Sequence, residues 1–276
     1  MKQRLLLFVR HWLLALQFFT RIPVTGRLAA WVGYSPAMLR ASAAHMPAIG
    51  ALIGALAAAL LGLLLWALPG VPAAPWVAAL ASTVWTVWLT GAFHEDGLAD
   101  LADGLGGSHE RERALEIMKD SRIGSFGAVA LVLAFGLKAA LLATLAQVDA
   151  ALAVAALFGA HATSRLAPLF VIATLPHVGD TPRSKSKPLA DAISASALFT
   201  GTLWWGVAMA LLIGWRTDPA WGVALLATAL AGCWMRGLLK RRLQGFTGDG
   251  LGATQQVGEI AFYLGLALAI GPRVGL

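Results

Sequence analysis

A dense group of carboxylates follows the second long apolar segment of the chain. Glu95, Asp96, Asp100 and Asp103 fall within nine positions. On a helix, the three aspartates are spaced i, i+4 and i+7 along one face, where like charges disfavour the helix unless a cation neutralises them. Mg²⁺ suits such a group, because it takes oxygen ligands and typically uses one or two carboxylates together with waters and phosphate oxygens. The pattern therefore predicts a magnesium–phosphate site, and the alternative interpretation is a solvated helix cap.

Two cations and another acid follow this group: Lys119, Arg122 and Asp120. The glycines at 104–107 predict a flexible break, and the charged stretch 110–119 predicts a short surface helix. Lys119 and Arg122 could neutralise phosphate charge during a transfer reaction, with Asp120 as a further ligand or a general base. Anchoring of a membrane protein by positive charges explains the two cations equally well.

A second polar constellation precedes the last apolar segment. Four glycines within eight residues predict a tight turn and close approach of the backbone to a ligand. A helix cap by Asp249 or Thr254 explains the turn. It does not explain Gln255, Gln256 and Glu259 on an apolar helix, where polar groups need partners.

Other basic residues are weaker candidates for function. Arg165 lies near one end of an apolar segment and needs a carboxylate or a phosphate as its partner. Arg183 and Lys185 lie in the loop 177–191, which predicts an anion-binding patch. Lys138 lies deeper in an apolar segment, where a structural ion pair or a side chain reaching toward the membrane surface is as good an explanation as function.

The composition shows which solvent these residues face. The chain has 276 residues, of which 58% are hydrophobic and 13% charged. Soluble domains are roughly 45–50% apolar and about 25% charged, so a soluble globular domain is excluded, as is disorder. The net charge of +7 does not by itself indicate nucleic acid, because in membrane proteins the position of the positive residues matters more. The single cysteine, Cys233, excludes an internal disulfide framework, and its apolar surroundings predict a packing role.

The apolar segments predict an all-α polytopic membrane protein with about seven transmembrane helices. A spanning helix needs about 20 mostly apolar residues. The N-terminal stretch 5–19 is shorter and is interrupted by Arg10 and His11, so it predicts an amphipathic helix at the membrane interface. No repeat or linker is evident, which predicts one domain over residues 1–276, with the N-terminal segment 1–45 included. The predicted spans are Met46–Leu68, Trp76–Phe93, Gly124–Ala146, Ala150–Ile172, Ile193–Ile213, Pro219–Leu238 and Leu251–Ile270.

The positive residues predict the orientation of the chain. With seven spans, only Arg216 and Arg273 of the 21 lysines and arginines lie on the side opposite the N-terminus, and Lys138 and Arg165 lie within spans. Cytoplasmic loops of membrane proteins carry the excess of positive charge. The N-terminus and the acidic group are therefore predicted to face the cytoplasm, with the protein in the inner membrane.

These motifs resemble those of the cobalamin synthase family, membrane enzymes also called adenosylcobinamide-GDP ribazoletransferases. There are two departures: Glu95 adds a carboxylate, and Gly250 stands where a bulkier residue is common. The resemblance rests on Phe19-Thr20-Arg21-Ile22-Pro23-Val24, on Pro47 with Gly50 and Gly54, on 94–107 with 117–124, and on Phe246-Thr247-Gly248-Asp249 with Gly252-Ala253-Thr254-Gln255.

The resemblance implies the closing step of the cobalamin nucleotide loop, with Mg²⁺ as the cofactor. Adenosylcobinamide-GDP and α-ribazole, or its 5′-phosphate, would give adenosylcobalamin, or its 5′-phosphate, and GMP. The implied partners are these two substrates and the lipid bilayer, without nucleic acid, and a homo-oligomer is allowed.

That reaction gives each candidate residue an expected role. The expected metal ligands are Glu95, Asp96, Asp100 and Asp103. The expected catalytic residues are Lys119, Asp120, Arg122 and Asp249. The expected substrate-binding residues are Arg21, Arg165, Arg183, Lys185, Thr247, Gln255 and Glu259.

Two other functions compete with this interpretation. A CDP-alcohol phosphotransferase is suggested by 100–104, which matches the start of that family's acidic motif, but Gly107 and Ser108 stand where an Ala-Arg pair should follow. A transporter also uses acids within the membrane, near the bilayer midplane. Here only Asp149 and Asp218 of the 14 acids lie on the opposite side, and the others lie in or beside the segments predicted to be cytoplasmic, which favours an enzyme.

Overall fold

The computed structural model describes residues 2–179 and 193–271, which are almost entirely helical. Within these ranges the only β-structure is an isolated bridge between His177 and Phe246. The predicted all-α class is therefore confirmed. The helices are α1 (Lys2–Phe19), α2 (Gly26–Val32), α3 (Pro36–Ser42), η1 (Ala43–His45), α4 (Met46–Ala67), α5 (Ala74–Thr90), α6 (Phe93–Gly107), α7 (Arg111–Ile117), α8 (Ser125–Val148), α9 (Ala150–Ser164), α10 (Ala167–Thr174), α12 (Ala195–Trp215), α13 (Ala220–Leu243) and α14 (Gly248–Ile270).

Five stretches are long and apolar enough to cross a membrane, compared with the seven that the sequence predicts. Helix α5 is long and apolar enough to cross a membrane only when α6 is counted with it. The two helices meet at 90°, so a sixth crossing would be bent. The last predicted span, Leu251–Ile270, lies in α14. This helix is not among the candidate membrane spans found in residues 2–179 and 193–271. The five are Pro36–Ala67, Ser125–Val148, Ala150–Thr174, Ala195–Trp215 and Ala220–Leu243.

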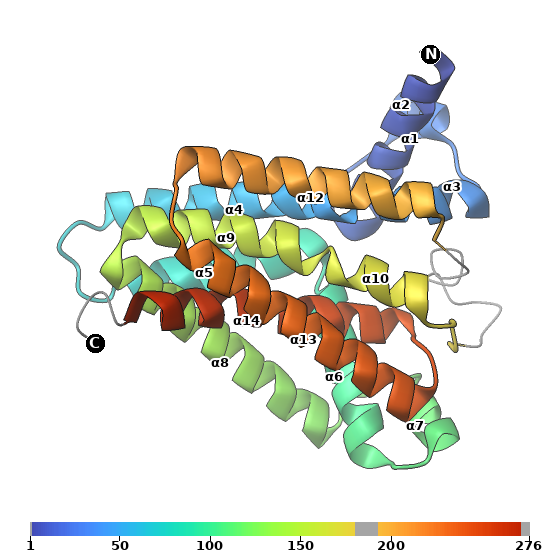
Figure 1. Cartoon of the computed structure of the whole chain (residues 1–276). Coiled ribbons are helices and arrows are strands. Elements are labelled where there is room, and N and C mark those ends of the chain that lie inside the picture. The colour runs from blue at the N-terminus through green and yellow to red at the C-terminus, as the bar shows by residue number, and fades with distance from the viewer. Residues whose placement is uncertain (1, 180–192, 272–276) are drawn as a thin grey trace.

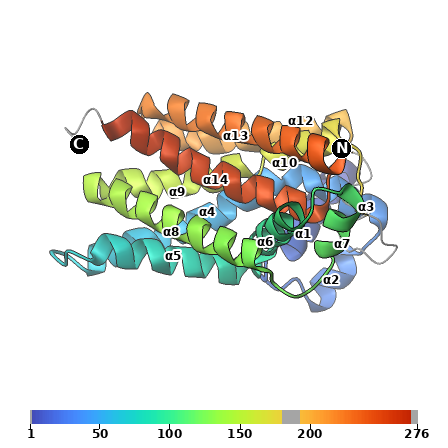
Figure 2. The ribbon, with the colours of Figure 1, turned by 90° about the horizontal axis from the view of Figure 1, so that it is seen from below.

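Helix α14 carries polar side chains because it lies inside the bundle. It packs against α13, α6, α9 and α8, and Figures 1 and 2 show it among the other helices. Gln255, Gln256 and Glu259 are all buried there by protein. Polar groups in a membrane are tolerated where protein rather than lipid surrounds them, and this accounts for the low hydropathy of a helix at the centre of the fold.

The two ends of the bundle differ. Helices α1, α2, α3, α6 and α7 gather at one end, while the α4–α5 connection and the C-terminal end of α14 lie at the other (Figures 1 and 2). The predicted acidic group therefore lies at the end that also carries the N-terminal helices.

Small residues let the central helices approach closely. A Cβ on Gly50 would lie 2.2 Å from the carbonyl oxygen of His161, and one on Gly54 would lie 2.9 Å from the Cβ of the same residue. Such contacts are typical of helix packing in membranes, where small residues allow backbones to meet. The Gly50 and Gly54 element of the family resemblance is therefore a contact between α4 and α9.

Two local predictions have different outcomes. The predicted N-terminal helix is found as α1, and it ends at Phe19, where the Thr20 hydroxyl donates to the carbonyl of Leu16 at 2.6 Å. The predicted flexible break at 104–107 is wrong, because α6 continues to Gly107. The reason is packing: a Cβ on Gly104 would lie 2.5 Å from the side chain of Met118, so the absent side chain gives room to a neighbour.

Candidate active site

A sharp corner between α5 and α6 turns the acid-bearing helix across the end of the bundle. Gly91 and Ala92 form this corner with φ angles of 68° and 60°. A positive φ is free for glycine but costs a residue with a Cβ roughly 1–2 kcal/mol. The guanidinium of Arg21, an expected substrate ligand, lies against the corner, since a Cβ on Gly91 would be 2.9 Å from its Nε. The exposed Arg21 therefore lies beside the start of α6.

Helix α6 then meets the start of α14 at very short range. A Cβ on Gly97 would lie 2.7 Å from the carbonyl oxygen of Asp249, and one on Gly252 would lie 3.1 Å from the carbonyl oxygen of His94. At Gly252 the close approach is therefore made by neighbouring backbone, whereas the sequence predicts approach by a ligand. This contact joins two motifs that are about 150 residues apart in the chain.

The contact brings three carboxylates into one group, the rim carboxylates Asp96, Asp100 and Asp249. They lie outside the five long spans. Burial raises the pKa of Asp100 to about 7, and repulsion from Asp249, Asp96 and Asp103 adds to this rise. Burial also raises the pKa of Asp249 to about 6, with Asp96 adding repulsion. The rim carboxylates thus repel one another, which is the electrostatic condition in which a bound cation stabilises a site most.

Asp103 lies beside this group, but its oxygens hold the start of α8. The carboxylate accepts hydrogen bonds from the backbone N–H groups of Gly124 at 2.7 Å and Gly127 at 2.8 Å. A Cβ on either glycine would lie 2.4 Å from an Asp103 oxygen, so only glycine leaves room for the carboxylate. Asp103, expected as a metal ligand, is therefore a cap that satisfies otherwise unpaired N–H groups at a helix N-terminus.

Glu95 points away from the rim and into the bundle. It is buried, and its Oε1 accepts a hydrogen bond from Gln256 Nε2 at 2.9 Å. Gln256 also donates to the side-chain oxygen of Gln255 at 2.9 Å. The structure therefore does not bring Glu95, expected as a metal ligand, to the rim carboxylates, although Asp96 is its neighbour in the chain. We call the buried group that contains Glu95, Lys138, His161, Arg165, Gln255, Gln256, Glu259 and Tyr263 the interior network.

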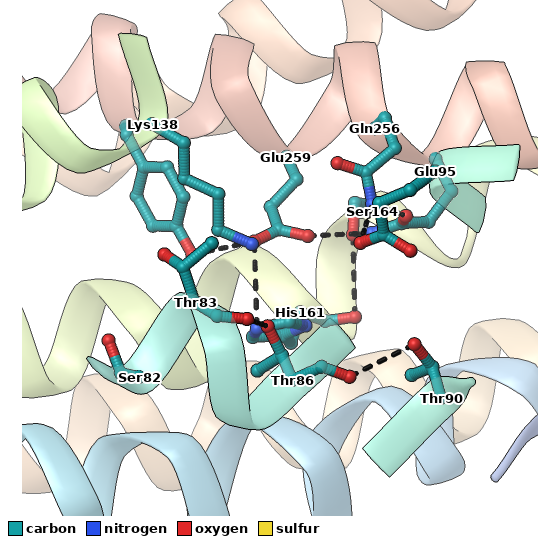
Figure 3. A network of polar contacts seen from close by, with 12 residues as sticks. Ser82, Thr83, Thr86, Thr90, Glu95, Lys138, His161, Ser164, Gln256 and Glu259 are labelled. Carbon is teal, nitrogen blue, oxygen red and sulfur yellow. Dashed lines mark hydrogen bonds and ion pairs between the residues drawn. The ribbon is translucent and has the colours of Figure 1, made fainter. Parts of the chain in front are cut away.

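Glu259 is the centre of the interior network (Figure 3). Its carboxylate pairs with Lys138 Nζ at 2.5 Å and accepts hydrogen bonds from Gln255 at 2.8 Å and from the Tyr263 hydroxyl at 3.0 Å. His161 Nε2 lies 3.5 Å from the same carboxylate. Glu259 and Gln255, both expected to bind substrate, thus contact other side chains of the protein and lie away from the rim.

The interior network is balanced in charge. Arg165, a further expected substrate ligand, is buried and contacts His161 through a ring nitrogen at 3.0 Å and the carbonyl oxygen at 3.1 Å. With a neutral His161, two cations, Lys138 and Arg165, face two carboxylates, Glu95 and Glu259. Buried charges are tolerated when they are paired and hydrogen-bonded. Lys138 and Glu259 meet that condition, whereas Arg165 Nε and Glu95 Oε2 have no hydrogen-bond partner among the described residues.

The loop after α7 presents an exposed ion pair. Arg122 Nη2 donates to Asp120 at 2.6 Å. Hydrogen bonds from the Arg122 side chain and backbone hold the pKa of Asp120 at about 2. A carboxylate with so low a pKa is a weak base at neutral pH. The pair borders an open cavity of about 560 Å³ whose polar lining residues are Asp103, Arg113, Glu116, Asp120, Arg122 and Ser125.

Four expected residues remain to be placed. Thr247 is buried and caps α14, since its hydroxyl accepts from the backbone N–H of Gly250 at 3.1 Å. Lys119 lies in the turn after α7, where its backbone N–H donates to the carbonyl of Glu116 at 3.1 Å. Arg183 and Lys185 lie outside the described residues, so the predicted anion-binding loop has no structural description.

The rim carboxylates fit a hard divalent cation whose coordination is completed by substrate phosphates. No set of three or more His, Cys, Asp or Glu side chains in residues 2–179 and 193–271 is arranged to enclose a metal ion. Mg²⁺ does not need such an enclosure, because one or two carboxylates suffice when substrate phosphates complete its coordination. The mutual repulsion of Asp96, Asp100 and Asp249 is the observation that matches this donor set.

Sequence reasoning missed two features of this site. It assigned Asp249 to the same reaction as Asp96 and Asp100, but it did not identify the contact between their helices, for which Gly97 and Gly252 carried the signal. It also assigned Gln255 and Glu259 of α14 to substrate binding. The chain already contained Lys138 to pair with Glu259, but spacing within one segment does not reveal partners on another.

Comparisons with known proteins extend over nearly the whole chain. The family model for cobalamin-5-phosphate synthase matches residues 11–267. An adenosylcobinamide-GDP ribazoletransferase of Albidiferax ferrireducens is 61% identical over 95% of this chain and 99% of its own. Proteins of the same name from Polaromonas naphthalenivorans and Leptothrix cholodnii are 58% and 46% identical, over 96% and 93% of this chain and 100% and 94% of theirs. No solved structure matches the chain.

Proposed function

Because the chain belongs to the cobalamin-5-phosphate synthase family, we propose that it is an adenosylcobinamide-GDP ribazoletransferase. The 3′-hydroxyl of α-ribazole, or of its 5′-phosphate, attacks the phosphorus next to cobinamide. The bond from that phosphorus to the bridging oxygen breaks, and GMP leaves with the electron pair. The carrying observation is the match to this family over residues 11–267, together with the rim carboxylates that α6 and α14 bring together at one end of the bundle.

Two of the rim carboxylates would hold Mg²⁺, which would in turn bind the diphosphate. Asp96 and Asp100 would supply metal-binding oxygens from adjacent turns of α6. When bound, Mg²⁺ would neutralise charge on the diphosphate. Little covalent chemistry falls to the protein in phosphoryl transfer, so these residues act by alignment and charge.

Asp249 is the best candidate for the general base. Its raised pKa, about 6, lies near neutral pH, where a base is most effective. Asp120 was the other candidate, but its pKa of about 2 and its pairing with Arg122 argue against that role. Lys119, Arg122 and the exposed Arg21 remain proposed contacts for phosphate oxygens. The open cavity beside Arg122 supports this role for the arginine.

We further propose that the end with the rim carboxylates faces the cytoplasm and that the protein resides in the inner membrane. The distribution of lysines and arginines supports this orientation. Both substrates are soluble and carry phosphate or sugar groups, and a site at one end of the bundle is reachable from water without crossing the bilayer.

The test is product formation by purified protein in lipid nanodiscs. We expect adenosylcobinamide-GDP, α-ribazole and Mg²⁺ to yield GMP and a cobalamin in equal amounts, with no turnover after chelation of the metal. A second reaction supplies a CDP-alcohol and a lipid acceptor, and a third measures uptake into proteoliposomes. Lipid product or uptake without GMP would overturn the proposal in favour of a phosphotransferase or a transporter.

A further inference from the structure

An apolar groove runs along the side of the bundle, away from the rim carboxylates. It has a volume of about 520 Å³ and lies between α12 and α13, with α9 and α10 as its floor. Trp205 comes from α12, Phe170 from α10, and Leu225, Leu226 and Cys233 from α13. Cys233 is exposed, contrary to the packing role that the sequence predicts.

The groove exists because two consecutive helices pack on different partners. Helix α12 packs on α4 and α9, whereas α13 packs mainly on α14. Figure 1 shows α12 and α13 diverging from their shared turn, so the space between them widens toward the end that carries α10. Both helices are candidate spans with mostly uncovered surfaces, so the groove opens toward the bilayer.

Polar atoms inside the groove are already satisfied by the protein. Trp205 Nε1 donates to the Thr163 hydroxyl at 3.2 Å, and the Thr228 hydroxyl donates to the carbonyl of Ala224 at 2.9 Å. A ligand that lies along this part of the groove therefore needs to offer only apolar surface.

One end of the groove is different, because Arg236 is the single charged residue among the described residues that line it. Its Nε donates to the Thr174 hydroxyl at 2.7 Å, which fixes the plane of the guanidinium at the mouth. Arginine at such a position binds phosphate through the remaining N–H donors. Lys240 is exposed one turn further along α13 and adds positive charge.

The length of the groove matches one leaflet of a membrane. From Leu225 to Arg236 the helix advances eleven residues, or about 17 Å at about 1.5 Å per residue. One leaflet contributes roughly half of the ~30 Å hydrocarbon core. An acyl chain that starts at Arg236 would therefore end near Leu225.

We propose that this groove binds one anionic phospholipid, with an acyl chain between α12 and α13 and its phosphate on Arg236. The apolar walls, the opening toward the bilayer and the positive mouth each match a part of that molecule. A second copy of the chain would cover the apolar walls but would leave Arg236 in need of an anion, so the lipid is the better occupant.

The chain provides its own probe, because Cys233 is its only cysteine. A bimane label on Cys233 in nanodiscs is quenched by phospholipids that carry bromine on the acyl chain. We expect brominated phosphatidylglycerol to quench at a concentration about fivefold lower than brominated phosphatidylcholine, the preference that one arginine near a membrane surface gives. Arg236→Gln should remove this preference, and the matched change Arg241→Gln, on the same helix but outside the groove, should keep it.

A label elsewhere on the lipid-facing surface provides the reference. In a Cys233→Ser, Val132→Cys variant the label lies on α8, where Val132 is 71% exposed, and we expect both lipids to quench it equally. Because the label itself could displace a lipid, the rate of Cys233 alkylation by a maleimide is also measured on unlabelled protein. Phosphatidylglycerol should slow this rate in the wild type but not in Arg236→Gln.

Three results would overturn the proposal. The first is equal quenching of the Cys233 label by both lipids. The second is a preference for phosphatidylglycerol that persists in Arg236→Gln. The third is a Cys233 alkylation rate that phosphatidylglycerol does not change in the wild type. Rapid formation of a Cys233–Cys233 cross-link between chains, independent of lipid charge, would instead assign the groove to an interface between copies.

Discussion

Helix α14 carries two carboxylates in opposite electrostatic settings. Asp249 lies at its start with Asp96 and Asp100 as neighbours, so that like charges face one another. Glu259 lies ten residues later and is paired with Lys138 and hydrogen-bonded to Tyr263. The same helix therefore holds one acid whose charge the protein leaves uncompensated and one whose charge it neutralises.

The contrast separates residues that can bind a ligand from residues that stabilise the fold. A carboxylate already surrounded by protein donors has no capacity left for a metal or a phosphate. The rim carboxylates have no ion pair with a cationic side chain among the described residues, and a cation with a diphosphate would supply the missing charge. The interior network holds α14 in place against α6, α8 and α9 and so keeps Asp249 at the rim.

The largest expected effect is loss of turnover at the rim. We expect Asp249→Asn to lower the rate of GMP release by about 10²–10⁴-fold, the range typical of a lost general base. Thermal unfolding should stay the same or rise, because one of several mutually repelling charges is removed. The matched control, Asp120→Asn, should retain most of the activity. If the two variants lose activity equally, Asp249 is not the base.

The interior network should respond in the opposite manner, with a loss of stability. Glu259→Gln leaves the buried Lys138 without its counter-charge, which costs roughly 3–5 kcal/mol of unfolding free energy. The double variant Glu259→Leu, Lys138→Met removes both charges and should recover most of that loss. Unfolding in mild detergent, followed by circular dichroism, measures each variant. A Glu259→Gln protein as stable as the wild type would contradict the assigned pairing.

A smaller effect is expected at Asp103, which lies near the rim but caps α8. Asp103→Ala removes the acceptor for two backbone N–H groups and should cost about 1–2 kcal/mol of stability. Asp103→Asn keeps an acceptor oxygen and should recover about half of this loss while leaving the Mg²⁺ dependence of GMP release unchanged. A large increase in the Mg²⁺ concentration needed by Asp103→Asn would show that this residue is a metal ligand after all.

The smallest effect is a pH dependence of stability in metal-free protein. The folded state raises the pKa of Asp100 to about 7 and of Asp249 to about 6, so it binds their protons more tightly than the unfolded chain does. The resulting stabilisation is complete below the ordinary aspartate pKa and is lost as pH rises through 6 to 7. Solvent screens these partly exposed groups, so the melting temperature should fall by only a few degrees. Mg²⁺ should restore it above pH 7, and Asp100→Asn should flatten the pH profile.

Most of the helices could be predicted from the sequence, because apolar length and charge are local properties. The N-terminal helix α1, the surface helix α7 and five of the spans follow from them. Helix α14 is the informative exception. Its polar side chains lower its hydropathy, and only burial by α13, α9 and α8 explains how it resides at the centre of the bundle.

The sequence by itself determined that this is an all-α membrane protein, which family it belongs to, and that Asp96 and Asp100 share one face of a helix. These properties depend on composition, on motifs and on spacing within a single segment. Only the tertiary structure decided that Asp249 joins those two residues, that Asp103 caps α8, and that Glu95 turns inward to Gln256. The physical reason is that such partners come from distant segments, and close contacts at Gly97 and Gly252 select which faces of α6 and α14 meet.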